Sequence, residues 1–72
     1  MNMSSKMKTH EVLKVELAVL ESEHRDLDEA IKAMEERAAP DQLAIRRMKK
    51  RKLALKDEIA AIQDRLTPDI IA

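Results

Sequence analysis

The chain of 72 residues contains no cysteine, no glycine and no aromatic residue, and each absence excludes a class of site. Without cysteine, disulfide bridges and thiolate metal ligands are excluded, and the two histidines, His10 and His24, lack the spacing of a ligand pair. Without glycine, phosphate-binding loops and tight hairpin turns that need a positive φ are hard to build. We therefore expect no metal site and no cofactor.

The chain also lacks net charge and long apolar runs. Fourteen basic residues balance fourteen acidic ones, so no overall field attracts polyanions. No apolar run approaches the length of a membrane span, and no secretory signal follows the first methionine. These features predict a soluble cytoplasmic protein with no membrane association. Ala, Leu, Glu, Lys and Arg dominate instead, which is typical of long helices and coiled coils.

Apolar residues recur at alternating steps of three and four residues in two segments, which is the heptad pattern of a coiled coil. The pattern predicts one helix over about residues 10–37, a turn at 38–40, and a second helix over about 41–66. The positions expected to form the contact seam between them are Leu13, Leu17, Leu20, His24, Leu27, Ile31 and Met34 in the first helix, and Ile45, Met48, Lys52, Leu55, Ile59, Ile62 and Leu66 in the second.

The boundaries of this unit follow from capping residues and prolines. Thr9 is a suitable N-cap, so residues 1–8 are expected to form a flexible tail. Pro40 fits the first turn of the second helix. The predicted hairpin therefore covers residues 9–67, and residues 68–72 form a C-terminal tail.

The short turn predicts that the second helix folds back along the first. If Leu20 lies level with Ile59, then Ile31 lies level with Met48, and every other seam residue also finds a seam partner at its own level. The sequence therefore predicts an all-α fold, an antiparallel two-helix hairpin that resembles a coiled coil.

A basic run begins the second helix, where six of the seven residues from Arg46 to Lys52 are basic. Segment 21–36 of the first helix holds seven acidic residues and two basic ones, so the register brings an acidic half-helix against a basic one. On one flank, Glu21, Asp28 and Glu35 face the same side as Lys49 and Lys56. The charge pairs expected across the hairpin are Asp28 with Lys52, Glu21 with Lys56, and Glu16 with Arg65. Their main effect is to fix direction and register.

The alternative interpretation of the basic run is nucleic-acid binding. Arg46, Arg47, Lys50 and Arg51 are not all needed for the hairpin and are suited to bind phosphates. The absence of aromatic residues argues against stacking on single-stranded bases. Intramolecular charge matching is therefore the preferred interpretation.

Two blocks of this sequence, HRDLDEAI (24–31) and DQLAIRRMKKRKLALKDEI (41–59), resemble the YdcH-like family of small bacterial proteins. The family pattern reads H-x-x-L-D-x-x-I and then K-K-x-K-L-x-L-K-D, and every position of it is present here. The resemblance implies a helical hairpin of uncharacterised function and a bacterial origin. It brings no catalytic residues.

His24, on the apolar seam, is the only residue that the sequence suggests for a chemical role. It is expected to hydrogen-bond locally, for example to Asp28 one turn later, or to act as a pH-sensitive group, since histidine titrates near neutrality. No nucleophile, oxyanion donor or pocket-building segment accompanies it, so we expect no enzymatic activity.

Apolar residues outside the seam are left without a partner in one hairpin. Val12, Val15 and Val19 form a second stripe on the first helix, which Ala30 and Ala33 continue. The candidate oligomer or partner surface consists of Val12, Val15, Val19, Leu53, Ile70 and Ile71. We expect a homo-oligomer, with a dimeric four-helix arrangement favoured, or docking onto another bacterial protein. The sequence thus predicts a small interaction module, with nucleic-acid association through the basic run as the alternative.

Overall fold

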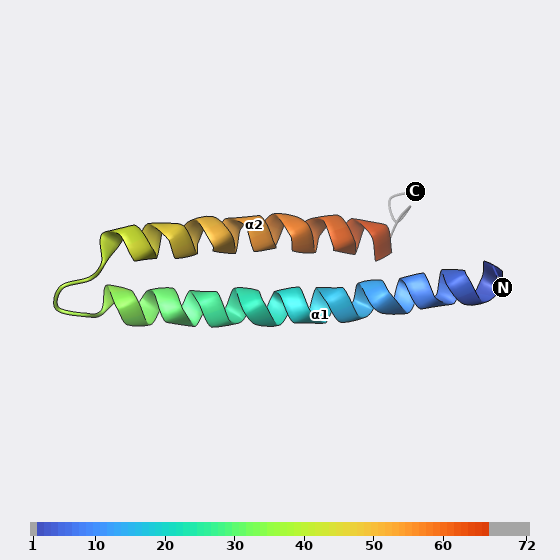
Figure 1. The fold of residues 1–72 in the computed structure, drawn as a ribbon, viewed down its shortest axis with the longest axis horizontal. Coiled ribbons are helices and arrows are strands. Elements are labelled where there is room, and N and C mark those ends of the chain that lie inside the picture. Colours follow the sequence, from blue (N-terminus) through green and yellow to red (C-terminus); the bar gives the residue numbers. More distant parts are fainter. Residues whose placement is uncertain (1, 67–72) are drawn as a thin grey trace.

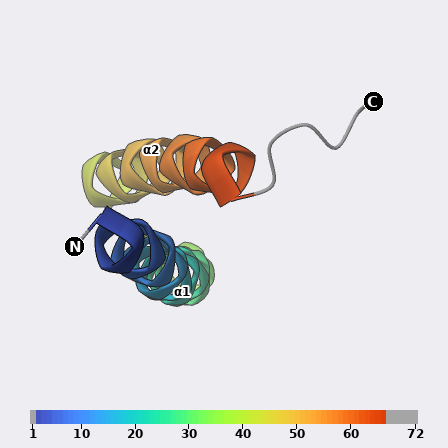
Figure 2. The same ribbon diagram turned by 90° about the vertical axis from the view of Figure 1, so that its right-hand side faces the viewer.

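A computed structural model describes the backbone of residues 2–66 and the side chains of residues 9–66. It contains two helices, α1 (Asn2–Glu35) and α2 (Gln42–Leu66), which lie side by side and run in opposite directions (Figure 1). No strand occurs in the described part of the chain. The predicted all-α antiparallel hairpin is therefore confirmed. The view along the helices shows that no third described element covers either side of the pair (Figure 2).

The start of α1 differs from the sequence prediction. The helix begins at Asn2, whereas Thr9 was expected to cap it after a flexible tail over residues 1–8. The helix can extend to the amino-terminal side of Thr9 for a simple physical reason. No glycine or proline precedes Thr9, and an N-cap residue stops a helix only when the chain before it leaves the helical conformation. The expected C-terminal tail, residues 68–72, lies outside the described residues.

The turn shows how α2 starts. The backbone N–H of Ala44 donates to Oδ1 of Asp41 at 3.1 Å, and the N–H of Ile45 donates to the carbonyl of Asp41 at 3.0 Å. Asp41 is therefore the N-cap, since its carboxylate satisfies an N–H that has no partner within the helix. Pro40 lies immediately before the cap and outside the helix. Pro40 was expected in the first turn of the second helix, so that prediction is corrected. Its missing N–H is needed by neither helix.

The contact between the helices is a single apolar seam. Five hydrophobic residues are buried, and only Leu55 among the described side chains is fully buried. The five are Leu13, Ile31, Ile45, Leu55 and Ile62, and all of them occupy expected seam positions. The other nine expected positions, His24 and Lys52 included, are half-buried. Two helices can cover only one face of each other, so most of the seam remains partly open to solvent.

Candidate functional site

The seam divides the surface of the hairpin into two sides. We call the lysine side the one that carries Lys52 and Asp28. We call the opposite side of the seam the valine side. It is defined by one line of residues on each helix. These lines are Val12, Glu16, Val19 and Glu23 on α1, and Arg51, Ala54, Glu58, Ala61 and Arg65 on α2. Residues three or four apart lie on one face of a helix. Two observations join these lines: Glu23 is 3.6 Å from Arg51, and Val12, Glu16 and Arg65 line one hollow.

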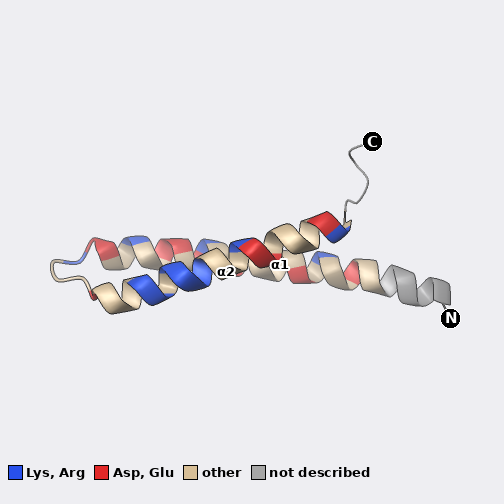
Figure 3. Ribbon diagram, turned by 90° about the horizontal axis from the view of Figure 1, so that it is seen from above, with Lys and Arg blue, Asp and Glu red and all other residues tan. Residues whose placement is uncertain are grey.

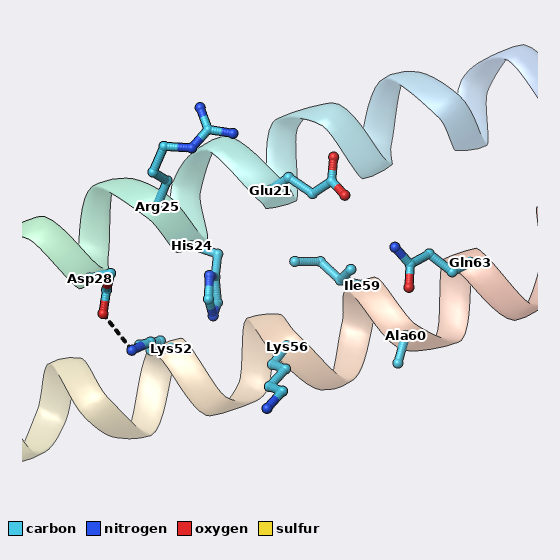
Figure 4. A pocket seen from close by; sticks show the side chains of 9 residues that line it. All are labelled: Glu21, His24, Arg25, Asp28, Lys52, Lys56, Ile59, Ala60 and Gln63. Atoms are coloured by element: carbon cyan, nitrogen blue, oxygen red, sulfur yellow. Dashed lines mark hydrogen bonds and ion pairs between the residues drawn. The ribbon is translucent and has the colours of Figure 1, made fainter.

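The shortest polar contact between the described side chains of the two helices lies on the lysine side. Lys52 Nζ donates to Oδ1 of Asp28 at 2.6 Å (Figure 4). Lys32 Nζ lies 3.5 Å from Oδ2 of the same carboxylate. The hydrogen bond from Lys52 lowers the pKa of Asp28 below its ordinary value, and the charge of Lys32 acts in the same direction. Both partners of the Lys52–Asp28 bond are half-buried. The bond therefore holds the helices in register without leaving a charge unpaired in the seam.

A second ion pair lies nearer the turn on the same side. Lys49 Nζ is 3.1 Å from Glu35 Oε2. Both side chains are about half exposed, so the pair is screened by solvent and contributes little stability by itself. It does contribute to direction, because it joins the end of the acidic half of α1 to the beginning of the basic half of α2.

Two of the three expected charge pairs are absent from the described residues. Glu21 and Lys56 form no ion pair, because the exposed Lys56 side chain points away from α1 (Figure 4). Glu16 and Arg65 line the same hollow, yet they too form no ion pair.

The ion pair of Glu23 with Arg51 was not predicted. Arg51 also lies 3.8 Å from Glu58 on its own helix. The sequence did contain a signal for this contact. Glu23 follows Glu16 by one heptad, on the flank where only Glu16 and Arg65 had been considered.

These contacts divide the basic run into two sets. Lys49, Arg51 and Lys52 are each paired with α1. Arg46, Arg47 and Lys50 are exposed and take part in no ion pair within the described residues. The concentration of basic residues in the half of α2 next to the turn is visible in Figure 3, with acidic residues along the adjacent part of α1.

His24 lies half-buried at an open groove between the helices, which Arg25, Lys52 and Lys56 also line (Figure 4). The expected hydrogen bond from His24 to Asp28 is not present among the described side chains, since the carboxylate of Asp28 accepts from Lys52 instead. No group of three or more potential metal ligands occurs in this part of the chain. The groove thus presents charged groups of both signs around one imidazole, and no serine, threonine or cysteine lines it.

Among residues 9–66, the large apolar side chains that are exposed are three valines and two leucines. Val12 is 53% exposed, Val15 62% and Val19 54%. Leu53 is 61% exposed and lies near Lys49 and Lys56 on the lysine side, so it does not extend the valine stripe. Leu43, at 58%, was missed because it precedes the seam of α2 and belongs to no periodic pattern. Ile70 and Ile71, the remaining candidates for a partner surface, lie outside the described residues.

Comparison with known proteins places the chain in a family. A model for a family of proteins of unknown function (DUF465) matches residues 17–63, which is more than half of the sequence. The chain belongs to the DUF465 family. The DUF465 match covers every ion pair described above and most of the seam, but it begins after Val12 and Val15. No curated protein and no solved structure matches the chain significantly.

Neither helix of this DUF465 protein, within the described residues, is long and apolar enough to cross a membrane. The family description assigns no function. On the described surface, the valine stripe and the unpaired half of the basic run are two features that the hairpin itself does not need for its fold.

Proposed function

We propose that this DUF465 protein is a small, non-enzymatic helical interaction module that self-associates, with a dimer as the favoured state. The observation that carries the proposal is the stripe of Val12, Val15 and Val19. All three side chains are more than half exposed, and no described element lies over them.

The size of the hairpin supports the proposal. Only five of the described residues are buried, and chains this short bury little apolar surface on their own. Small domains without disulfides or metals usually gain the missing stability from oligomerisation or from very regular helix packing. Burying an apolar side chain stabilises by roughly 25 cal/mol per Å² removed from water. Covering the valine stripe with a second copy therefore adds stability that a single hairpin lacks.

The test replaces the stripe with charge. We expect the wild-type protein to have the molar mass of a dimer in light scattering at micromolar concentration. Val15→Lys combined with Val19→Lys should shift it to a less helical monomer, because each dimer would have to bury four ammonium groups. Leu53→Lys combined with Ala60→Lys is the matched control, since it adds the same charge at exposed apolar positions of the lysine side.

Three results would count against the proposal. The wild-type protein could be a well-folded monomer at that concentration. The valine double variant could keep the mass of a dimer. If the control pair dissociated the dimer and the valine pair did not, the interface would lie on the lysine side.

A second candidate function is association with nucleic acid. Arg46, Arg47 and Lys50 support it, because they lie close together on α2 and form no ion pair within the described part of the chain. Three phosphate contacts would give a plot of log K against log salt concentration with a slope no steeper than about −3. The affinity for a DNA duplex should fall as salt rises, and it should also fall when the charges of all three residues are reversed. An affinity that either change leaves unaltered would eliminate this candidate.

We also infer that the chain is a YdcH-like protein of bacterial origin. Both blocks that carry this resemblance, residues 24–31 and 41–59, lie within the segment that the DUF465 model matches. A cytoplasmic location is part of the same proposal and rests on the sequence alone.

A further inference from the structure

We propose that the valine side of the hairpin binds a second copy of the chain in one orientation, with both turns at the same end. A two-fold axis then runs parallel to the helices, and each α1 lies antiparallel on the partner subunit's α2. This inference rests on the proposed self-association and specifies its geometry. It follows from the distribution of charges that the single hairpin leaves unpaired.

Four exposed charged residues carry the argument. Asp26 and Glu29 on α1, and Arg47 and Lys50 on α2, take part in no ion pair within the described residues. At about 100° per residue, all four leave their helices well away from the seam. Because they point away from the seam, the two acidic residues cannot contact the two basic ones within one chain. The register nevertheless places Glu29 level with Lys50, and Asp26 lies about one turn from that level.

Placing the two turns together brings these groups within reach of each other. The acidic half of each α1 then lies along the basic half of the partner subunit's α2, at the levels that the seam already sets. Within the hairpin, Arg51 and Glu23 differ in level by more than Asp26 and Lys50 would in the dimer, and Arg51 still approaches Glu23 to 3.6 Å. Long basic side chains therefore span the offsets that the dimer requires.

The same orientation also fits the apolar residues. Ala54 and Ala61 are exposed and lie on the valine side of α2. Ala61 is nearly level with Val19, so Val19 of one subunit meets a small side chain on the other. Small side chains let helices approach closely, and typical distances between helix axes are about 8–10 Å.

The opposite orientation, with the turns at opposite ends, lacks this match. It places α1 on α1 and α2 on α2, so no acidic half of α1 lies along a basic half of α2. At full overlap, the acidic half of each α1 would instead lie along residues 9–20 of the other α1, where Glu11 and Glu16 outnumber Lys14. Like-charge contacts across an interface cost free energy, whereas complementary ones fix its register.

Distances between spin labels distinguish the two orientations. The chain has no cysteine, so a single introduced cysteine gives one label for each subunit. Ala38→Cys in the turn and Glu11→Cys near the open end are both exposed sites. With the turns together, both variants should give short distances between the backbones of the labelled residues, of about 10–20 Å, which is one to two helix spacings.

In the opposite orientation at full overlap, the Ala38→Cys labels would be separated by about the length of α2. Its 25 residues at 1.5 Å each give about 38 Å. If only the open ends overlapped, Glu11→Cys would give a short distance and Ala38→Cys a longer one still. A long distance at either site therefore refutes the orientation. A dimer mass with a long distance refutes only this inference, whereas a monomer mass refutes the proposed function as well.

Charge reversal tests the contacts themselves. Asp26→Lys with Glu29→Lys should weaken the dimer by at least about tenfold, since attractive contacts become repulsive on both sides of the two-fold axis. Adding Arg47→Glu and Lys50→Glu to the same chain should restore most of the affinity. The control Glu21→Lys with Lys56→Glu exchanges two unpaired charges on the lysine side and, like the fourfold variant, keeps the net charge, so it should leave the dimer unchanged.

Helix content measured by circular dichroism separates misfolding from dissociation in these variants. A variant that keeps its helix content yet shows no loss of affinity, or a fourfold variant without recovery, overturns the inference. So does a control that weakens the dimer as much as the Asp26 and Glu29 pair.

Discussion

Leu55→Ala is the substitution that should damage the hairpin most. Leu55 has no exposed surface, and it is the only described side chain that is completely enclosed between the two helices. Removing its side chain beyond Cβ takes apolar contacts from both helices at once. Leu53→Ala makes the same chemical change two residues earlier on the same helix, where the side chain is 61% exposed. The two variants therefore share their change in helix propensity and differ only in burial.

The expected magnitudes follow from this difference. A buried Leu→Ala substitution costs about 2–5 kcal/mol, depending on how far the surroundings close over the cavity. Two helices can close together more easily than an enclosed core, so we expect the low end, about 2–3 kcal/mol. Leu53→Ala should cost less than about 0.5 kcal/mol, as is usual for surface positions. Native stability is about 0.05–0.15 kcal/mol per residue, so the Leu55 change removes a large part of it.

Urea denaturation followed by circular dichroism measures both variants. All samples should be compared at one protein concentration, because self-association contributes to the apparent stability. We expect the midpoint of Leu55→Ala to fall well below the wild-type value and that of Leu53→Ala to stay close to it. Equal losses in the two variants would refute the assigned seam, since they would mean that burial of Leu55 is not what stabilises the hairpin.

Three further predictions concern polar residues. Lys52→Leu should keep or raise the melting temperature, because it removes a half-buried ammonium, but it should broaden the distribution of oligomers in native mass spectrometry; a large loss of stability would contradict this. Asp41→Ala should lower the free energy of unfolding by about 1 kcal/mol while Asp41→Asn preserves it, because asparagine can still accept from the N–H of Ala44; equal effects would exclude the cap. The hydrogen bond from Lys52 holds the pKa of Asp28 below its ordinary value in the folded state, so the charged carboxylate contributes stability above the ordinary pKa, and this contribution is lost as pH falls through the lowered pKa. The difference in urea midpoint between wild type and Asp28→Asn should therefore shrink from about pH 6 to about pH 2.5, and a constant difference would contradict the assignment.

The hairpin could be predicted from the sequence because its signal is repeated. The apolar stripe recurs in every heptad, and Pro40 interrupts it at one place. An error in the assignment of one residue therefore leaves the predicted fold unchanged. The start of α1 could not be placed in this way. Thr9 is a suitable cap, but a cap is a local preference worth about 1 kcal/mol, and the residues before it do not oppose a helix.

The charge pairs were harder to predict than the seam. The register fixes which residues lie level, and it gave Lys52 with Asp28. It does not fix where a long flexible side chain ends. Lys56 lies near Glu21 in level yet points away from α1, while Arg51 reaches past its own level to Glu23. Exposed pairs differ by less than about 1 kcal/mol, so a choice among them needs the three-dimensional positions.

The most direct test of the proposed self-association is sedimentation equilibrium of the unmodified chain from low to high micromolar concentration, at low and at high salt. The average mass should rise from the 8.3 kDa of one chain toward twice that value as concentration increases. The rise should persist at high salt, because apolar burial at the valine side is not screened. A mass that stays at 8.3 kDa over the whole range, with full helix content, would contradict self-association.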